Sequence, residues 1–163
     1  MKQKLKSGDL FQTPEWVYKP LGAFDLDPCA ALNTNIGKHN YRIENGEDGL
    51  TLPWFGFVWC NPPFSQKALW ARKMIDHGNG ILILPERGSA PWCGPLKLES
   101  KFHFVMGKKV NFIGGSSSNN AGSILFPFGN EAINRILNSM LPGDLNETRW
   151  FRPRPQQKDT LEI

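Results

Sequence analysis

Seven consecutive residues carry the clearest structural signal in this chain: Trp59-Cys60-Asn61-Pro62-Pro63-Phe64-Ser65. They overlap an apolar run from Phe55 to Cys60, which predicts a buried strand. Two adjacent prolines cannot continue a hydrogen-bonded ladder, so we expect the strand to end at a rigid corner. Asn61 begins this corner and Phe64 ends it. An amide followed by an aromatic ring is suited to holding a flat nitrogenous ring, and we therefore expect the active site here.

The residues after the corner predict a parallel βαβ unit. A helical spacing of apolar residues runs from Ser65 to Asp76, and a glycine-containing segment over 77–80 ends it. The wholly apolar run over 81–84 is typical of a central strand that is covered on both faces. A strand, a helix and a second strand in this order favour an α/β fold with a mixed, mostly parallel sheet.

A second predicted strand end carries a carboxylate. The segment over 23–27 alternates apolar and polar residues, and Pro28 breaks the pattern directly after Asp27. In open α/β sheets, ligands bind beyond the carboxyl ends of the strands. We therefore expect Asp27 and Asn61 to lie at neighbouring strand ends.

Less regular patterns predict the remaining elements. They are a helix with Thr13 as N-cap, a loop over 33–40, a weak strand over 41–43, a loop with some helix over 89–97, a hairpin of strands 102–106 and 109–113, a flexible loop over 114–122, a strand over 123–128 and a helix over 131–140.

Length and composition indicate one compact domain. The chain has 163 residues, of which 40% are hydrophobic, enough for an ordinary core. We place the domain over 1–142, with a flexible arm over 1–12. A polar, proline-rich tail over 143–163 has a composition typical of disorder. The net charge of +4 is compatible with a polyanionic partner but does not indicate one by itself.

Cysteine and histidine usage argues against a disulfide framework or a metal site. The three cysteines are an odd number without a C-x-x-C pair, and the three histidines lack metal-ligand spacing. No signal peptide or membrane-spanning apolar run is recognisable. We expect a cytoplasmic protein with reduced thiols, no bound metal and no membrane association.

The corner offers a way to activate an amine on an aromatic base. Such an amine is a poor nucleophile because its lone pair is delocalised into the ring. If the Asn61 side-chain oxygen and the Pro62 carbonyl accept its two N–H groups, they localise the lone pair without a strong base. Phe64 would stack on the ring and hold the amine in line with an electrophilic methyl group.

Asn61-Pro62-Pro63-Phe64 resembles the Asp/Asn-Pro-Pro-Tyr/Phe signature of amino-group DNA methyltransferases, which use S-adenosylmethionine. Further segments extend the likeness over residues 11–130. They are Thr13-Pro14-Glu15-Trp16, Leu26-Asp27-Pro28-Cys29-Ala30-Ala31, Asp48-Gly49-Leu50, Val58 to Ser65 and Leu84-Pro85-Glu86-Arg87. In this order and spacing, the chain resembles the compact bacteriophage DNA N6-adenine methyltransferases. The resemblance implies a Rossmann-like methyltransferase sheet, S-adenosylmethionine as cofactor, and flipped-out adenine in duplex DNA as substrate.

The resemblance also implies roles for individual residues. The catalytic group comprises Asn61, Pro62, Pro63 and Phe64. The residues expected around the cofactor are Thr13, Pro14, Asp27, Pro28 and Cys29 at its methionine part and Asp48 at its adenosine part. The residues expected to contact the extruded base or DNA phosphates are Ser65, Arg87, Ser89 and Trp92. The chain departs from the wider methyltransferase pattern in lacking a glycine-rich turn after Asp27.

Three alternatives compete with this interpretation. Cytosine C5 methyltransferases use a Pro-Cys nucleophile, and Pro28-Cys29 matches that pair. We disfavour this reaction, because Cys29 directly follows the first strand and Asn61 to Phe64 would have no role. The second alternative is a non-catalytic nucleic-acid or protein-binding module, suggested by the short length and the missing glycine-rich turn. The third is amino-group transfer to RNA or another planar amine.

Overall fold

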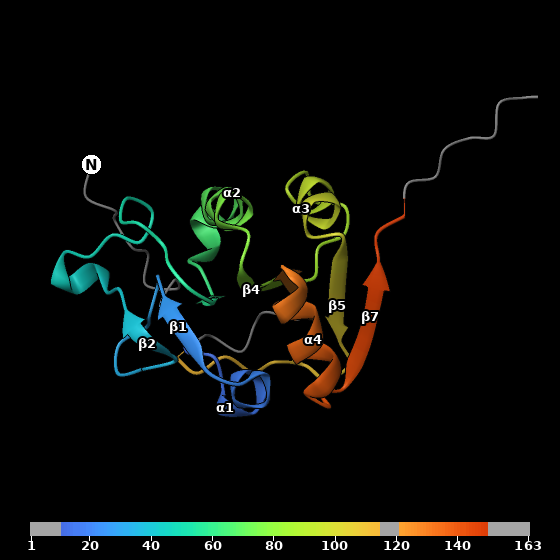
Figure 1. Ribbon diagram of the computed structural model, residues 1–163, viewed down its shortest axis with the longest axis horizontal. Helices are drawn as coiled ribbons and strands as arrows, with labels where there is room; N and C mark the ends of the chain where they lie inside the picture. Colours follow the sequence, from blue (N-terminus) through green and yellow to red (C-terminus); the bar gives the residue numbers. More distant parts are fainter. Residues whose placement is uncertain (1–10, 115–120, 150–163) are drawn as a thin grey trace, which may run out of the picture.

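A seven-stranded mixed sheet forms the centre of the computed structural model, which describes residues 11–114 and 121–149 (Figure 1). The strand order is β2-β1-β3-β4-β6-β5-β7. The first four strands in this order are parallel, and β6, β5 and β7 follow in antiparallel pairs. The strands are β1 (Phe24–Asp27), β2 (Gly37–Asn40), β3 (Val58–Cys60), β4 (Gly80–Pro85), β5 (Phe102–Met106), β6 (Ser123–Phe128) and β7 (Gly143–Glu147). The predicted α/β class with a mixed, Rossmann-like sheet is therefore confirmed.

Helices cover both faces of this sheet. They are α1 (Glu15–Tyr18), α2 (Lys67–His77), α3 (Cys93–Ser100) and α4 (Asn130–Asn138), with short 3-10 turns at Lys19–Leu21, Ile43–Asn45 and Phe64–Gln66. Figure 1 shows α2 and α3 on one face and α1 and α4 on the other. Each face has its own buried apolar cluster, so the sheet is the wall between two cores. Within the described ranges, no helix has the length and apolar character needed to cross a bilayer.

The predicted β3-α2-β4 unit is present. β3 ends at Cys60, the chain turns at the two prolines, and β4 pairs in parallel with β3. All residues of β4 are buried, as its apolar composition requires. Because β1 also pairs in parallel with β3, the carboxyl ends of β1, β3 and β4 lie along one edge of the sheet.

One strand lies where the sequence predicted a loop. β2 occupies Gly37–Asn40 within the segment 33–40, and the weak strand expected over 41–43 does not form. β2 is a polar strand at the outer edge of the sheet, so it lacks the apolar pattern by which strands are recognised. Gly37 permits the pairing, because a Cβ there would lie 2.5 Å from the Asp27 backbone nitrogen.

The predicted hairpin of 102–106 and 109–113 is wrong. β5 forms at Phe102–Met106, but its partners are β6 and β7. Residues 109–113 run on beyond the strand, and Ile113 makes a single antiparallel bridge to Gln12. Gly107 donates its N–H to the Pro142 carbonyl at 2.7 Å rather than forming a tight turn between paired strands. Residues 115–120 of the loop expected over 114–122 lie outside the described residues.

The tail expected from residue 143 begins with a strand. β7 pairs with β5 through five residue pairs, and its mostly exposed side chains explain why composition alone suggested a tail. Residues 150–163 lie outside the described residues, and so do residues 1–10 of the predicted arm. The last two residues of that arm, Phe11 and Gln12, are described and lie beside the predicted site.

Gly143, at the start of β7, provides a test of the sheet edge. Its φ is +155°, and a Cβ would lie 2.3 Å from the Val105 carbonyl oxygen and 2.6 Å from the Phe104 ring. We expect Gly143→Ala to lower the free energy of unfolding by about 2–3 kcal/mol, measured by urea denaturation.

The matched control is Gly46→Ala. Gly46 also has a positive φ, +81°, but a Cβ there would meet nothing within 4 Å. Only backbone strain of about 1 kcal/mol is expected from this variant. Equal losses in the two variants would contradict the close packing of Gly143 on β5.

Candidate active site

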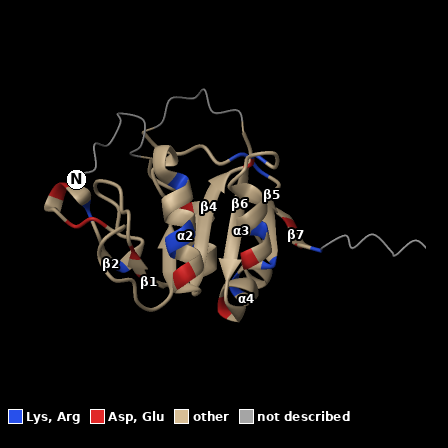
Figure 2. Cartoon of the chain, turned by 90° about the horizontal axis from the view of Figure 1, so that it is seen from above, with Lys and Arg blue, Asp and Glu red and all other residues tan. Residues whose placement is uncertain are grey.

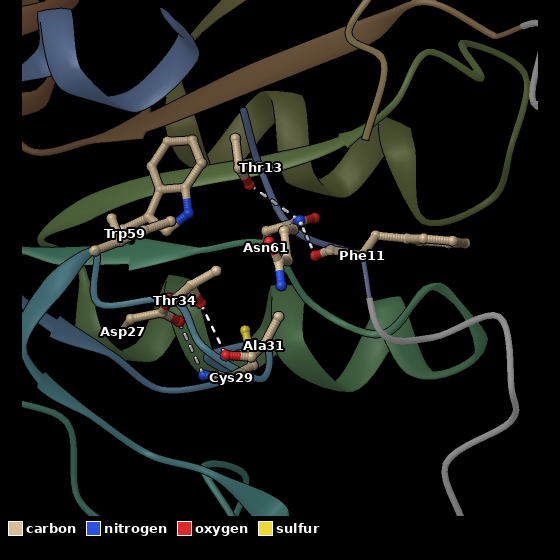
Figure 3. A pocket seen from close by; sticks show the side chains of 10 residues that line it. Phe11, Thr13, Asp27, Cys29, Ala31, Thr34, Trp59 and Asn61 are labelled. Atoms are coloured by element: carbon tan, nitrogen blue, oxygen red, sulfur yellow. Dashed lines mark hydrogen bonds between the residues drawn. The ribbon is translucent and has the colours of Figure 1, made fainter. Parts of the chain in front are cut away.

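Polar side chains from separate parts of the chain surround a small cavity at the carboxyl edge of the parallel strands. Asp27 ends β1, Asn61 directly follows β3, and Thr13 lies just before α1. The cavity, shown in Figure 3, has a volume of about 10 Å³, which is room for about one water molecule. Its lining comprises Phe11, Gln12, Thr13, Asp27, Cys29, Ala31, Thr34, Ile36, Trp59 and Asn61. Pockets that enclose a whole drug-sized ligand measure roughly 300–1,000 Å³, so this cavity would take no more than a small polar group at one end of a larger molecule.

The Asn61 amide is held on its nitrogen side. Its Nδ2 donates to the Phe11 carbonyl oxygen at 3.2 Å and to Thr13 Oγ1 at 3.1 Å (Figure 3). Its Oδ1 is buried and has no hydrogen-bond partner among the described residues. A buried acceptor without a partner is unfavourable, and native structures rarely keep one without a reason. The amide therefore presents an oxygen that is ready to accept an N–H from a ligand.

The prediction that Thr13 caps a helix is wrong. Pro14 occupies the N-cap position of α1, and no side chain caps that helix. The Thr13 side chain, which is 4% exposed, instead faces Asn61. Its role in this structure is therefore to join the segment before α1 to the end of β3.

The two prolines form the expected rigid corner. Pro62 and Pro63 are both buried. The Pro63 carbonyl accepts the Gln66 N–H at 3.1 Å, which opens the 3-10 turn Phe64–Gln66. α2 follows directly at Lys67, so the corner is fixed between β3 and a long helix.

Phe64 belongs to a group of three rings, which we call the aromatic triad: Phe11, Phe64 and Phe112. The Phe64 ring centroid lies 5.8 Å from that of Phe11 and 6.2 Å from that of Phe112. Phe11 and Phe112 are 6.4 Å apart. These separations are typical of favourable aromatic pairs. Phe11 and Phe112 were not predicted, since they lie in the assumed arm and hairpin.

Asp27 is a buried acid beside the cavity. It is 3% exposed, and its carboxylate accepts the Cys29 N–H at 3.1 Å. Burial raises the pKa of Asp27 to about 7, although the Cys29 hydrogen bond and the Arg42 charge oppose this rise. The described residues form no salt bridge to Asp27. The carboxyl group would therefore be stabilised in its ionised form by a cationic ligand.

The cysteines near the site are not poised as nucleophiles. Cys29 Sγ and Cys60 Sγ lie 3.6 Å apart, and both are free thiols. Burial raises the pKa of both thiols above the ordinary value. Since the thiolate is the reactive form, this environment argues against a Cys29 nucleophile of the cytosine C5 type.

The Asp48 loop is packed against the end of β1 but does not line the cavity. A Cβ on Gly49 would lie 1.9 Å from the Pro28 carbonyl oxygen, so this contact needs glycine. Asp48 Oδ1 accepts the Leu50 N–H at 2.9 Å. Lys73 of α2 donates to the Leu50 and Leu52 carbonyls at 2.8 and 2.6 Å, which fastens the loop to the helix.

The residues predicted to contact DNA lie farther from the cavity. Ser65, Arg87 and Ser89 are exposed, and Trp92 is half-buried. Lys67 connects Trp92 to the corner, because its Nζ donates to the Phe64 carbonyl at 3.1 Å and lies 5.8 Å from the Trp92 ring centroid. None of these four predicted residues lines the cavity. The other predicted site residues that do not line it, besides Asp48, are Pro14, Pro28, Pro62, Pro63 and Phe64.

Trp59 is a further residue that sequence reasoning did not single out. Its side chain lines the cavity, is fully buried, and has no partner for Nε1 among the described residues (Figure 3). A tryptophan in an apolar strand gives no sign of this. Trp59, Thr13 and Asp27 together offer two donors and an acidic group, which fits a zwitterionic ligand end. The described part of the chain holds no group of three or more His, Cys, Asp or Glu side chains suited to a metal ion.

Comparison with known proteins agrees with the resemblance found in the sequence. The family model for DNA N-6-adenine-methyltransferase (Dam) matches residues 1–147. A DNA N-6-adenine-methyltransferase of Escherichia phage T1 is 24% identical over 174 aligned residues, which cover 88% of this chain and 68% of the phage protein. The chain therefore belongs to the DNA N-6-adenine-methyltransferase (Dam) family.

Proposed function

We propose that this protein transfers a methyl group from S-adenosylmethionine to the N6 amine of adenine in DNA, in the cytoplasm. The observation that carries the proposal is Asn61 Oδ1 at a Pro-Pro corner, which is buried and has no hydrogen-bond partner in the described part of the chain. An exocyclic amine supplies the N–H that this atom lacks. Family membership supports the choice of adenine in DNA.

Asn61 and the corner would activate the amine by accepting its hydrogens. Asn61 Oδ1 takes one N–H and the Pro62 carbonyl takes the other, which concentrates the nitrogen lone pair toward the methyl carbon. S-adenosylmethionine would supply the methyl carbon for the new N–C bond, its sulfur would keep the former bonding pair, and the amine would lose one proton to water. Fixed acceptors need little reorganisation during this step, which lowers the barrier. Phe64 would stack on the base and keep its amine in line.

The polar lining of the cavity suits the charged groups at the amino-acid end of the cofactor. S-adenosylmethionine supplies an electrophilic methyl group on a positively charged sulfur. Asp27 would face the positive charge of the cofactor, while Trp59 Nε1 and the Thr13 hydroxyl would donate hydrogen bonds to the carboxylate of the cofactor. Pro28 and Cys29 lie at the same strand end, with Pro14 next to Thr13. Since the cavity is too small for the whole molecule, the adenosine part would extend toward the Asp48 loop, which packs on Pro28.

The DNA would approach the exposed rim formed by Ser65, Arg87, Ser89 and Trp92. Extruding a base from the duplex costs a few kcal/mol, offset by stacking and phosphate contacts. Figure 2 marks both basic and acidic positions along the ribbons of α2 and α3. This mixed charge favours local phosphate contacts at the rim over a broad positive face.

Replacing Asn61 by alanine tests the central acceptor. We expect Asn61→Ala to lower the single-turnover methylation rate by about a hundredfold or more, because one of two fixed acceptors is lost. Cofactor affinity, measured by calorimetry, should stay within about threefold of the wild type. The product would be quantified as N6-methyladenine in an adenine-containing duplex.

The matched control is Asn146→Ala, which removes an exposed asparagine of β7 whose Nδ2 donates to the Asp144 carbonyl. This variant should methylate at the wild-type rate. Near-wild-type turnover by Asn61→Ala would rule out the proposed mechanism. Wild-type protein that fails to bind S-adenosylmethionine at millimolar concentration would favour a non-catalytic module.

The titration of Asp27 gives a second test. Its folded pKa of about 7 exceeds the ordinary value of 3.8, so between these pH values the folded state holds a proton that the unfolded state has lost. The stability contribution of this proton is present below pH 4 and is lost as pH rises to 7. Between pH 5 and pH 8, the wild type should lose about 3 kcal/mol of unfolding free energy that Asp27→Asn does not lose.

Urea denaturation of both proteins at the two pH values checks this expectation, and parallel pH dependences would contradict it. With S-adenosylmethionine present, the cation should favour ionised Asp27. Calorimetry at pH 6 in two buffers of different ionisation enthalpy should then detect proton release by the wild type and not by Asp27→Asn.

A further inference from the structure

The Asn61 amide donates a hydrogen bond to Thr13, a residue that we expected to lie at the cofactor. We infer that Thr13 is a positioning residue, which together with the Phe11 carbonyl fixes the Asn61 amide so that its oxygen faces the substrate amine. This inference rests on the proposed function, because it assigns the orientation of the acceptor in that reaction. It adds a determinant that lies 48 residues before Asn61 in the chain.

The two contacts define a single orientation of the amide. A side-chain amide can be rotated so that its oxygen and nitrogen exchange places. The Phe11 carbonyl can only accept, so it requires the nitrogen at its position, 3.2 Å away. The rotated amide would place Oδ1 against another oxygen and would leave the buried Nδ2 without an acceptor there. Thr13 Oγ1, at 3.1 Å, accepts the second N–H, so both donors of the amide have acceptors in this orientation.

The segment that carries these acceptors is itself held in place. Gln12 and Ile113 exchange two backbone hydrogen bonds, each 3.0 Å long. The Gln12 side chain donates to the Leu32 carbonyl at 2.7 Å. The Pro14 carbonyl accepts the Val17 N–H at 3.0 Å in the first turn of α1. Residues 11–13 are thus held by hydrogen bonds at Gln12 and at Pro14, and they can impose an orientation on Asn61.

This arrangement also explains why an amide stands at position 61. The signature that the chain resembles admits Asp or Asn at its first position, and either can accept an N–H from a substrate. A carboxylate at position 61, however, has no N–H to give to the Phe11 carbonyl. Two oxygens would then face each other at about the 3.2 Å separation of the present hydrogen bond. Residues 11–13 therefore select Asn over Asp.

The test compares Thr13→Val with Thr13→Ser. Valine keeps the shape but removes the acceptor, whereas serine keeps the hydroxyl. With cofactor and adenine-containing duplex both saturating, Thr13→Val should show a single-turnover rate about ten- to a hundredfold lower, with Thr13→Ser within about threefold of the wild type. Thr148→Val, which removes a half-buried hydroxyl beside His103, is the control for loss of a threonine hydroxyl.

Nuclear magnetic resonance of the Asn61 side-chain NH₂ provides a readout that is independent of activity. In the protein without cofactor or DNA, both N–H protons should be protected from exchange with water. In Thr13→Val, the proton that faces position 13 should shift upfield and exchange faster, while Thr13→Ser and Thr148→Val should keep the wild-type signal. A merely structural role of Thr13 would not produce this selective change.

Three outcomes would overturn the inference. The first is a wild-type rate and unchanged amide protons in Thr13→Val. The second is a loss of cofactor affinity in Thr13→Val with a normal rate at saturation, which would leave Thr13 with its proposed cofactor contact and no role in orienting Asn61. The third comes from Asn61→Asp and can be measured even if Thr13→Val fails to fold. We expect Asn61→Asp to methylate at least about tenfold more slowly than the wild type. A wild-type rate in this variant would show that residues 11–13 impose no orientation.

Failure of the proposed function gives a different result. In that case the wild-type protein would not methylate adenine in any DNA offered to it, whatever the state of Thr13. The amide signals of the wild type, Thr13→Val and Thr13→Ser would still decide whether Thr13 orients Asn61.

Discussion

The hydrogen-bonding groups around the Asn61 amide are satisfied in one orientation of that amide, and the rest of the site follows from this constraint. The Phe11 carbonyl and the Thr13 hydroxyl accept its two N–H groups, and the buried Oδ1 has no partner within residues 11–114 and 121–149. In a low-dielectric interior, such an atom binds a donor more strongly than it would in water. An ordinary amide at the end of a strand thereby presents a buried acceptor for an N–H group of a ligand, as the proposed function requires.

The sheet supplies the frame for this acceptor. β1 and β3 are parallel neighbours, so Asp27 and Asn61 leave the sheet at the same edge and enclose one cavity. The loop that carries Asp48 is held near this edge by the contact of Gly49 with Pro28 and by the hydrogen bonds of Lys73. Burial then gives Asp27 an elevated pKa, so that its charge responds to a cation beside it.

The fold and the corner could be predicted because their causes are local. Two prolines stop a strand wherever they occur, and the apolar run over 81–84 can only be buried. β2, the pairing of β5 and the strand β7 could not be predicted, since polar edge strands follow from the register of their neighbours. Local patterns likewise predicted Thr13 to cap a helix. Its actual partner, Asn61 at the end of β3, is distant in sequence, so no local pattern indicates the contact. Phe11, Trp59 and Phe112 were missed for the same reason: their importance arises from contacts across the fold.

The central claim is that the amine of adenine is the atom that receives the methyl group. The most direct measurement incubates the protein with isotopically labelled S-adenosylmethionine and a duplex that contains all four bases. The DNA is then hydrolysed, and the labelled nucleoside is identified by mass spectrometry. The account predicts that the label appears in N6-methyldeoxyadenosine. Label in a methylated cytosine, or in no nucleoside although the cofactor is bound, would contradict it.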